Sequence, residues 1–247
     1  MERKMQKLSD QEVRNIQIEL LDEFVSVCNK LGLYYTLGGG TLLGAIRHKG
    51  FIPWDDDVDI MMPLPDMLRF KELFKSETMC YCDVDTDKRY KYAFSRIANT
   101  QTYNKNGLIS TSYGICIDLY PVLGLPLSIE GIEQFFKKGE RELNRRLRII
   151  RLVDLVKRFL PVTYVNGFNE AMKRYRDFLF QYPYERTKYF FTNGGELEMR
   201  NVHEFDLFEE CTEVLFEGHK FMSIARYDDY LRHFYGDYMQ LPPEDQR

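Results

Sequence analysis

The clearest helical pattern in the sequence lies near its start. Ser9 and Glu12 have the spacing of a capping box, in which each side chain accepts a hydrogen bond from the other residue's backbone amide. Gly32 is a helix-stop signal. Between these signals apolar residues recur at steps of three and four: Val13, Ile16, Leu20, Phe24, Val27 and Leu31. The pattern predicts one long amphipathic helix that buries one face.

Shorter elements of alternating type follow. Apolar runs bounded by Gly or Pro predict strands at 33–37, 57–62, 90–98 and 114–120, the last ended by Pro121. Helices are expected at 41–48 and, after Pro63, through Met67, Phe70 and Phe74. Because strands and helices interleave, we expect an α/β (α+β) domain, with a mixed sheet flanked by helices.

The second half of the chain has a different pattern. Residues 130–181 are helical in periodicity, and the last third returns to mixed structure. There we expect a strand at 213–216, a turn at Glu217–Gly218 and a helix at 227–235. The interpretation is a core domain at 1–125, a helical insertion or subdomain at 126–185, and a C-terminal mixed segment at 186–247 that packs on the core.

Composition narrows the classes of function. The chain has 247 residues, 44% of them hydrophobic, and a net charge of −4, which gives no reason to expect nucleic-acid binding. No apolar run reaches the length of about 18 residues that a membrane-spanning helix needs, and the first ten residues lack the apolar core of a secretory signal. Five cysteines without zinc-site spacing predict reduced core thiols and a cytoplasmic protein.

The chemistry is concentrated in the run LGGGTLLGAIRHKGFIPWDDDVDIMM, residues 37–62. In a strand, Asp57 and Asp59 point to one face while Val58 and Ile60 point to the core. Neighbouring carboxylates repel each other unless a cation lies between them, and hard oxygen ligands suit Mg²⁺ or Mn²⁺. A solvated acidic turn is the alternative interpretation, which the apolar neighbours disfavour.

A glycine turn precedes these acids. Gly38, Gly39 and Gly40 link a predicted strand to a predicted helix, so their amides could approach a phosphate at a helix N-terminus. A plain tight turn would explain the glycines equally well if they stood alone. Gly40, however, precedes Asp57 by 17 residues. A glycine turn at this distance from paired carboxylates matches the layout of the nucleotidyltransferase superfamily.

The run GGGTLLGAIRHKGFIPWDDDVDI resembles the LicD family of phosphocholine transferases, whose distant relatives include fukutin-related transferases. The resemblance continues in CIDLYP, FEGHKFMSI and YDDYLRHFYGDYMQLPP, so it spans most of the chain apart from about 125–200. It implies a nucleotidyltransferase fold that moves phosphocholine from CDP-choline to a glycan hydroxyl and releases CMP. The acceptor would be a teichoic acid, lipopolysaccharide or capsule glycan, met in the cytoplasm or at the inner face of the membrane.

The resemblance also implies roles for residues. Asp57 and Asp59 would bind the metal, and Asp118 would be a third ligand and the catalytic base, although a strand-end cap would also explain Asp118. Substrate-binding residues would be drawn from the glycine turn, the basic helix end and a later strand: Gly39, Gly40, Thr41, Arg47, His48, Lys49, Arg96 and Asn99. The basic triplet could instead only stabilise a helix C-terminus, and Arg96 and Asn99 could be ordinary strand-surface residues.

Two further features have alternative interpretations. Trp54 either pins the Pro53 loop or forms one wall of an aromatic box for a quaternary ammonium, together with Tyr92, Tyr103 or Tyr120. Residues 137–158 contain nine basic residues and three acids. That segment is either a helix with a solvated basic face or a docking surface for anionic lipid headgroups or a phosphate-rich acceptor.

Other functions use part of the same motif. Nucleotidyl transfer to a small hydroxylated substrate would use the same carboxylates. A glycosyltransferase would use Asp57-Val58-Asp59 as a DxD motif, but it would need neither the glycine turn nor Asp118. A non-catalytic scaffold is disfavoured because all three acids are present. Ribitol-phosphate or glycerol-phosphate donors would release the same nucleotide as CDP-choline.

Overall fold

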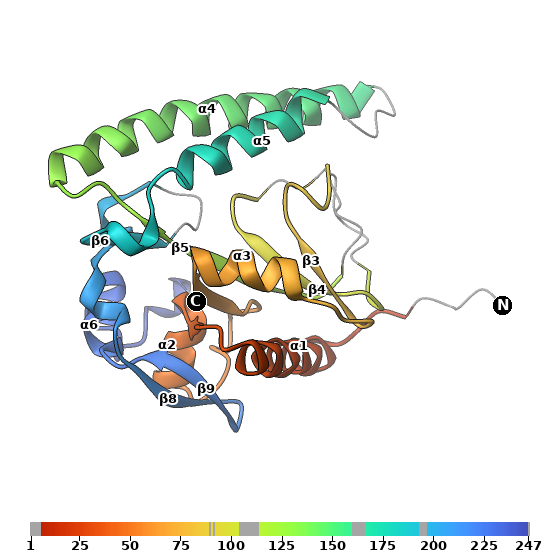
Figure 1. Cartoon of the computed structure of the whole chain (residues 1–247). Coiled ribbons are helices and arrows are strands. Elements are labelled where there is room, and N and C mark those ends of the chain that lie inside the picture. The colour runs from red at the N-terminus through yellow and green to blue at the C-terminus, as the bar shows by residue number, and fades with distance from the viewer. Residues whose placement is uncertain are drawn as a thin grey trace.

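The computed structural model describes residues 6–88, 90, 92–103, 114–159, 166–192 and 197–246. Within them, a mixed sheet is flanked by helices, and a long helical hairpin lies at one end (Figure 1). The α/β (α+β) class expected from the sequence is confirmed.

Seven strands of the described chain form the main sheet, in the order β1-β2-β5-β4-β3, with β6 paired to β5 and β7 to β6. Their bounds are β1 Thr36–Leu37, β2 Asp59–Pro63, β3 Met79–Cys82, β4 Ser95–Asn99, β5 Cys116–Gly124, β6 Tyr189–Thr192 and β7 Val202–Glu204. The β2–β5 pair is parallel, and the other pairs are antiparallel.

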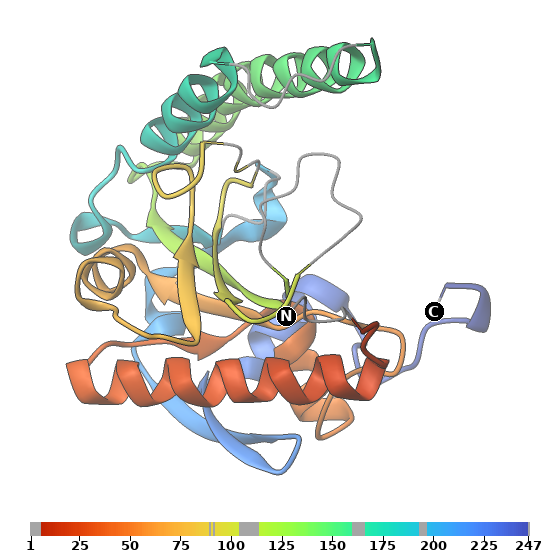
Figure 2. The same ribbon diagram turned by 90° about the vertical axis from the view of Figure 1, so that its right-hand side faces the viewer.

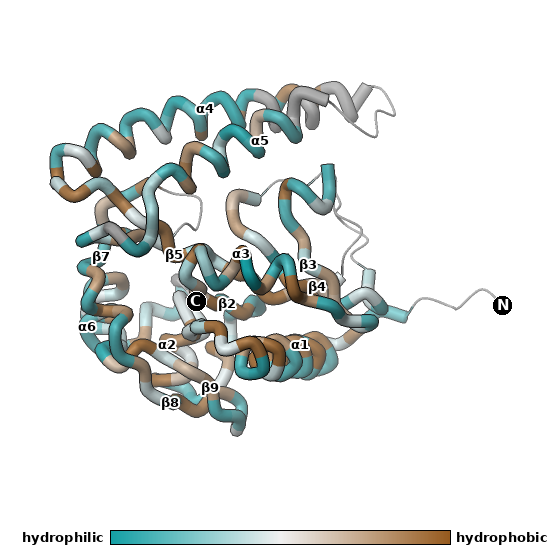
Figure 3. Tube along the Cα trace, in the orientation of Figure 1, coloured by the Kyte–Doolittle hydropathy of each residue, from teal (hydrophilic) through white to brown (hydrophobic). Residues whose placement is uncertain are grey.

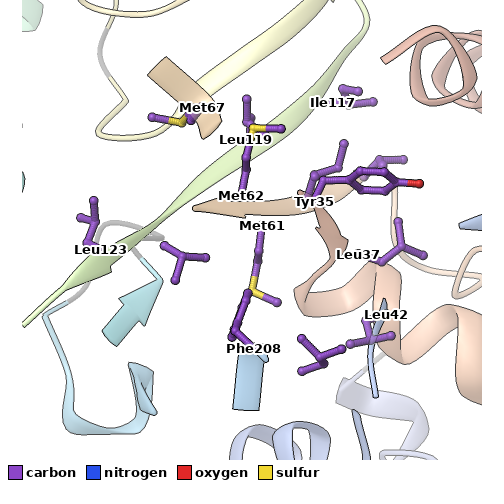
Figure 4. Packing of buried hydrophobic residues seen from close by; sticks show 14 of the residues in the cluster. Tyr35, Leu37, Leu42, Met61, Met62, Met67, Ile117, Leu119, Leu123 and Phe208 are labelled. Atoms are coloured by element: carbon purple, nitrogen blue, oxygen red, sulfur yellow. The ribbon is translucent and has the colours of Figure 1, made fainter. Parts of the chain in front are cut away.

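Helices α1 (Asp10–Leu31) and α3 (Leu64–Leu73) cover one face of this sheet. The capping box of α1 is confirmed in both directions, and Gly32 ends the helix with a left-handed φ of 62°. Figure 4 shows the alternation of the strands: Met62 points toward Met67 of α3, whereas Met61 points to the opposite face, toward Phe208. That opposite face carries the candidate site.

Two more helices and a β-hairpin complete the core. They are α2 (Gly39–Arg47), α6 (Tyr227–Tyr235) and the hairpin of β8 (Cys211–Phe216) and β9 (His219–Ile224), which contacts β1 and α2. Short 3-10 helices lie at Tyr184–Arg186, Met199–Asn201, Phe205–Phe208 and Glu244–Gln246. The sheet and α1 are rich in hydrophobic residues, whereas the long helical hairpin at one end of the molecule is mostly hydrophilic (Figure 3).

The helical segment is a hairpin of α4 (Ile129–Phe159) and α5 (Asn166–Leu179). Two views show it at the end of the molecule opposite the β8–β9 hairpin (Figures 1 and 2). Phe135 of α4 stacks on Phe178 of α5, with ring centroids 4.8 Å apart, and it also meets Phe191 of β6. The hairpin is therefore joined to the sheet through its aromatic base.

Several sequence expectations need correction. Pro121 does not end its strand, because β5 continues to Gly124. On one edge of β5, residues 116–119 pair with β4 and residues 122–124 pair with β6. Pro121 lies between these two stretches, and its nitrogen faces this edge, because the amide of Asp118 faces the other edge, toward β2. The missing N–H of Pro121 therefore costs no hydrogen bond of the sheet. Strands β3, β6 and β7 were not predicted. All five cysteines are free, as expected, but Cys211 is exposed, so not every thiol belongs to the core.

Within the described residues, no helix has both the length and the apolar content required to cross a bilayer.

Candidate active site

Asp59 and Asp118 lie side by side on the central pair of strands. They are register partners in the parallel β2–β5 ladder, and the amide of Asp118 donates to the carbonyl of Val58 at 2.8 Å. In-register partners of a parallel pair present their side chains on the same face. Val58 and Ile60 are fully buried, as the alternation predicted. The structure thus brings Asp59 and Asp118 together on neighbouring strands, and the charge of Asp57 acts on both.

The glycine turn wraps around Asp59. The amide of Gly40 donates to Asp59 Oδ2 at 3.2 Å, and the amide of Gly38 donates to the carbonyl of Asp59 at 2.9 Å. Gly39 has a φ of +46°, and a Cβ at this position would lie 2.5 Å from Asp59 Oδ2. Thr41 is buried, and its Oγ1 accepts the amide of Asp59 at 2.8 Å. In this arrangement Thr41 positions Asp59.

The carboxylate of Asp59 has an unfavourable environment for its charge. Burial raises its pKa well above the usual value, and the charges of Asp57 and Asp118 raise it further, against the opposing hydrogen bond from Gly40. Asp59 Oδ1 is buried and has no hydrogen-bond partner among the residues that the structure describes. Burial and the neighbouring Asp57 also raise the pKa of Asp55 to about 6. In this acid cluster, backbone hydrogen bonds lower the pKa of Asp55 and Asp59, and among the described residues no cation appears beside their carboxylates.

Asp118 is the exception in this cluster, because Arg96 compensates it. The two residues are partners across β4 and β5. Arg96 Nη2 donates to Asp118 Oδ2 at 2.9 Å, and Nε lies 2.7 Å from Oδ1. Burial nevertheless keeps the pKa of Asp118 above its usual value. The guanidinium of Arg96 also lies over the ring of Tyr92, 3.9 Å from its centroid.

The metal-binding role of Asp57, Asp59 and Asp118 stays a prediction. Within the part of the chain that the structure describes, no three His, Cys, Asp or Glu side chains are arranged to hold a metal ion. The physical reason is that both oxygens of Asp118 face Arg96, while Asp57 is exposed at the end of the loop before β2. In this structure the carboxylate of Asp118 is therefore paired with Arg96.

Sequence reasoning missed two tyrosines of α6. The amide of Gly39 donates to the hydroxyl of Tyr230 at 3.3 Å, so α6 contacts the glycine turn directly. Burial, and then the charges of Asp59 and Asp55, raise the pKa of Tyr235 to about 12, so this half-exposed tyrosine lies within electrostatic reach of the acid cluster. Both tyrosines lie in the run YDDYLRHFYGDYMQLPP, which carries part of the family resemblance and could have marked them, and Asp55 could have been found in the Asp-Asp-Asp run.

The basic triplet lies at the other end of α2, about 12 Å along the helix axis from the glycine turn. Arg47 Nη1 donates to the carbonyl of Tyr238 at 2.7 Å, and His48 is the C-terminal cap. Lys49 has a φ of 63° in the following turn, and its carbonyl accepts the amide of Glu217 at 3.0 Å. These contacts give the triplet a structural role, and its role toward a substrate stays a prediction.

The other residues predicted to contact a substrate lie in different places. Trp54 meets the ring of His48 edge-on, at a centroid distance of 6.1 Å. The rings of Tyr92 and Tyr120 lie near that of Phe94, with centroids 5.2 and 4.5 Å from it, so the three rings form one aromatic cluster beside Arg96. The remaining two residues, Asn99 and Tyr103, do not join this cluster. Asn99 faces the opposite side of the sheet from Arg96, and Tyr103 is exposed.

Comparison with known proteins places this geometry in a family. The family described as LicD/FKTN/FKRP, nucleotidyltransferase domain, matches residues 32–126, which include the glycine turn and all four clustered acids. The ribitol 5-phosphate transferase FKRP of mouse and that of human are each 45% identical over 53 residues, 22% of this chain and 11% of theirs.

A longer match extends over both chains. The lipopolysaccharide cholinephosphotransferase LicD of Haemophilus influenzae is 30% identical over 263 aligned positions, 98% of this chain and 95% of the relative. Because the similarity runs through the helical hairpin and the C-terminal segment as well as the glycine turn and the acids, the chain belongs to the LicD family.

Proposed function

We propose that this chain is a metal-dependent phosphotransferase. It moves phosphocholine, or a similar phospho-substituent, from a CDP-linked donor to a hydroxyl of a cell-surface glycan and releases CMP. The observation that carries the proposal is the buried, unpartnered Oδ1 of Asp59 within an undercompensated acid cluster beside a glycine turn. The names of the Haemophilus influenzae and FKRP relatives support transfer of a phospho-substituent.

The residues present fit a divalent cation. Mg²⁺ sites that handle phosphates commonly use one or two carboxylates, with waters and phosphate oxygens completing the coordination. Asp57 and Asp59 would hold Mg²⁺ or Mn²⁺, and Asp118 is the adjacent third carboxylate. When bound, the cation would neutralise charge on the diphosphate and lower the pKa of an acceptor hydroxyl.

The protein's own groups would orient and protect the substrates. The Gly39–Gly40 backbone allows close approach of a phosphate because neither residue has a Cβ. Arg96 holds Asp118 in place, and the raised pKa of Asp118 suits a group that accepts a proton from the acceptor hydroxyl. Tyr235 would cover the acid cluster from α6. Positioning and charge compensation supply most of the rate enhancement in such transfers.

The proposed partners are CDP-choline or another CDP-linked donor and a glycan acceptor, met in the cytoplasm or at the inner face of the membrane. Ribitol-phosphate and glycerol-phosphate donors stay alternatives, since each would release the same nucleotide.

The decisive experiment incubates the protein with Mg²⁺ and CDP-choline, CDP-ribitol or CDP-glycerol, and identifies the nucleotide released. CMP is the expected product because phosphotransfer breaks the bond between the two phosphates. CDP would indicate glycosyl-type transfer, and pyrophosphate released from CTP with a hydroxylated substrate would indicate nucleotidyl transfer. Either of these outcomes would overturn the proposal.

A further inference from the structure

The outer face of α4 has an unusual composition for a helix on a hydrophilic surface. Its inner face carries the buried residues Ile132, Phe135 and Phe136. Its outer face, from residue 137 onward, carries six side chains at steps of three and four: Lys137, Arg141, Arg145, Arg148, Leu152 and Leu155. All six are exposed. We call this set the outer stripe.

The outer stripe contains no acid. At 100° per residue, Glu140 lies on one flank of the stripe and Glu142 on the other, nearer the buried face. The stripe runs for about 27 Å along the helix, at 1.5 Å per residue. It is thus a continuous band of positive charge that ends in two leucines.

The two leucines separate this surface from an ordinary solvated basic face. Leu152 is 57% exposed and Leu155 is 56% exposed, and both continue the same band as the arginines. A solvated face needs no large apolar side chains. Basic residues combined with exposed leucines are instead typical of helices that lie on a membrane surface.

We propose that the outer stripe of α4 docks the protein on a membrane that carries anionic headgroups. Charge complementarity selects the occupant, since a basic side chain close to such a surface contributes about 1 kcal/mol. The leucines would enter the boundary between headgroups and acyl chains. The α4–α5 hairpin lies at one end of the molecule, which leaves the rest of the domain clear of the surface (Figures 1 and 2). This inference does not depend on the proposed reaction.

Vesicle flotation tests the proposal on the full chain. Wild-type protein should float with vesicles of phosphatidylcholine containing phosphatidylglycerol, should not float with pure phosphatidylcholine, and should be released by high salt. The variant Arg141→Glu/Arg145→Glu/Arg148→Glu should lose at least about tenfold in partitioning. Lys30→Glu/Lys75→Glu/Lys188→Glu is the matched control. It changes the net charge equally at exposed positions outside α4, and it should retain binding.

Two further measurements keep the test sharp. Leu152→Ser/Leu155→Ser should weaken flotation, because the leucines bury apolar surface in the membrane. The salt dependence of flotation should stay unchanged in this variant, because its basic residues are intact. Far-UV circular dichroism and nucleotide release from a water-soluble reaction should be unchanged in all variants. Equal loss in the stripe variant and its control would overturn the proposal. The proposal would also be overturned if Arg141→Glu/Arg145→Glu/Arg148→Glu still bound vesicles but no longer bound soluble polyphosphate. That result would identify the outer stripe as a site for a phosphate-rich polymer.

Discussion

Two acid clusters of this protein have opposite electrostatics. At the base of the helical hairpin, Lys71 lies 2.5 Å from Asp83 and 2.8 Å from Asp85, and Arg176 and Lys173 of α5 also reach Asp85. Burial alone would raise the pKa of Asp85, but hydrogen bonds from Lys71 and the charges of Arg176 and Lys71 lower it to about 2.

The cluster at the glycine turn has the reverse balance. Arg96 compensates Asp118, while the pKa values of Asp55 and Asp59 are raised by burial and by neighbouring carboxylates. Perturbed acids without compensating charge are typical of functional sites, whereas compensated acids are typical of structural ones. The comparison therefore distinguishes a site suited to a cation from an ionic network that holds two elements together.

The largest effect should come from removing the charge of Asp59. Asp59→Asn should lower CMP release by about 10²–10³-fold, the usual cost of losing one electrostatic contact to a transition state. Its thermal midpoint should be equal to or above that of the wild type, because a buried and unpaired carboxylate has been removed. Steady-state rates and thermal melts measure both. An inactive variant that was also strongly destabilised would mean that Asp59 is structural.

Divalent cations should stabilise the protein through the Asp59 cluster and not through the Asp85 cluster. Mg²⁺ or Mn²⁺ should raise the unfolding free energy of the wild type by about 2.7 kcal/mol at a hundredfold excess over Kd, because the cation binds only the folded site. Asp59→Asn should abolish this shift, whereas Asp85→Asn should leave it intact. Calorimetric titration checks the affinity independently of activity. A shift that survived in Asp59→Asn would contradict the assignment.

Gly39→Ala tests the close packing of the glycine turn against Asp59. We expect a loss of about 1–2 kcal/mol from the positive φ alone, and a further loss because the new Cβ would lie 2.5 Å from Asp59 Oδ2. Gly218→Ala is the matched control, since Gly218 has a φ of +82° but open space around it. Urea unfolding measures both variants. If the two lost equal stability and Gly39→Ala kept full activity, close packing against Asp59 would have no role.

The smallest effect is expected in the compensated cluster. Asp85→Asn should cost less than about 1 kcal/mol, because this side chain is 38% exposed and solvent screens the ion pairs. Since the folded pKa of Asp85 is depressed, its contribution is present above pH 3.8 and is lost as the pH falls toward 2. The raised pKa of Asp55 has the opposite sign: metal-free protein should lose stability as the pH rises from 3.8 to about 6. Melts at several pH values, with Asp55→Asn and Asp85→Asn, separate the two slopes.

Local signals in the sequence predicted the parts of the structure that local physics decides. The capping box and Gly32 bounded α1, and the alternation around Val58 correctly gave the buried face before β2. The juxtaposition of Asp59 and Asp118 followed from the family motif. Strand pairing then supplied the geometry.

What the sequence did not predict depends on contacts between distant segments. The pairing of Arg96 with Asp118 requires that β4 and β5 be neighbours, and the approach of Tyr235 requires the fold of α6. The contact of Arg47 with Tyr238 likewise joins segments that lie far apart in the sequence. Pro121 was taken as a strand end because its edge position is a property of the whole sheet.

The pairing of β6 with β5 has a consequence for engineering. The strand that carries Asp118 is completed by residues almost seventy positions later in the chain, and Tyr230 is later still. A protein trimmed to residues 32–126 would therefore present an unpaired sheet edge to solvent, which favours intermolecular strand addition. Minimal versions of this enzyme should be sought by shortening the α4–α5 hairpin rather than by removing the C-terminal third.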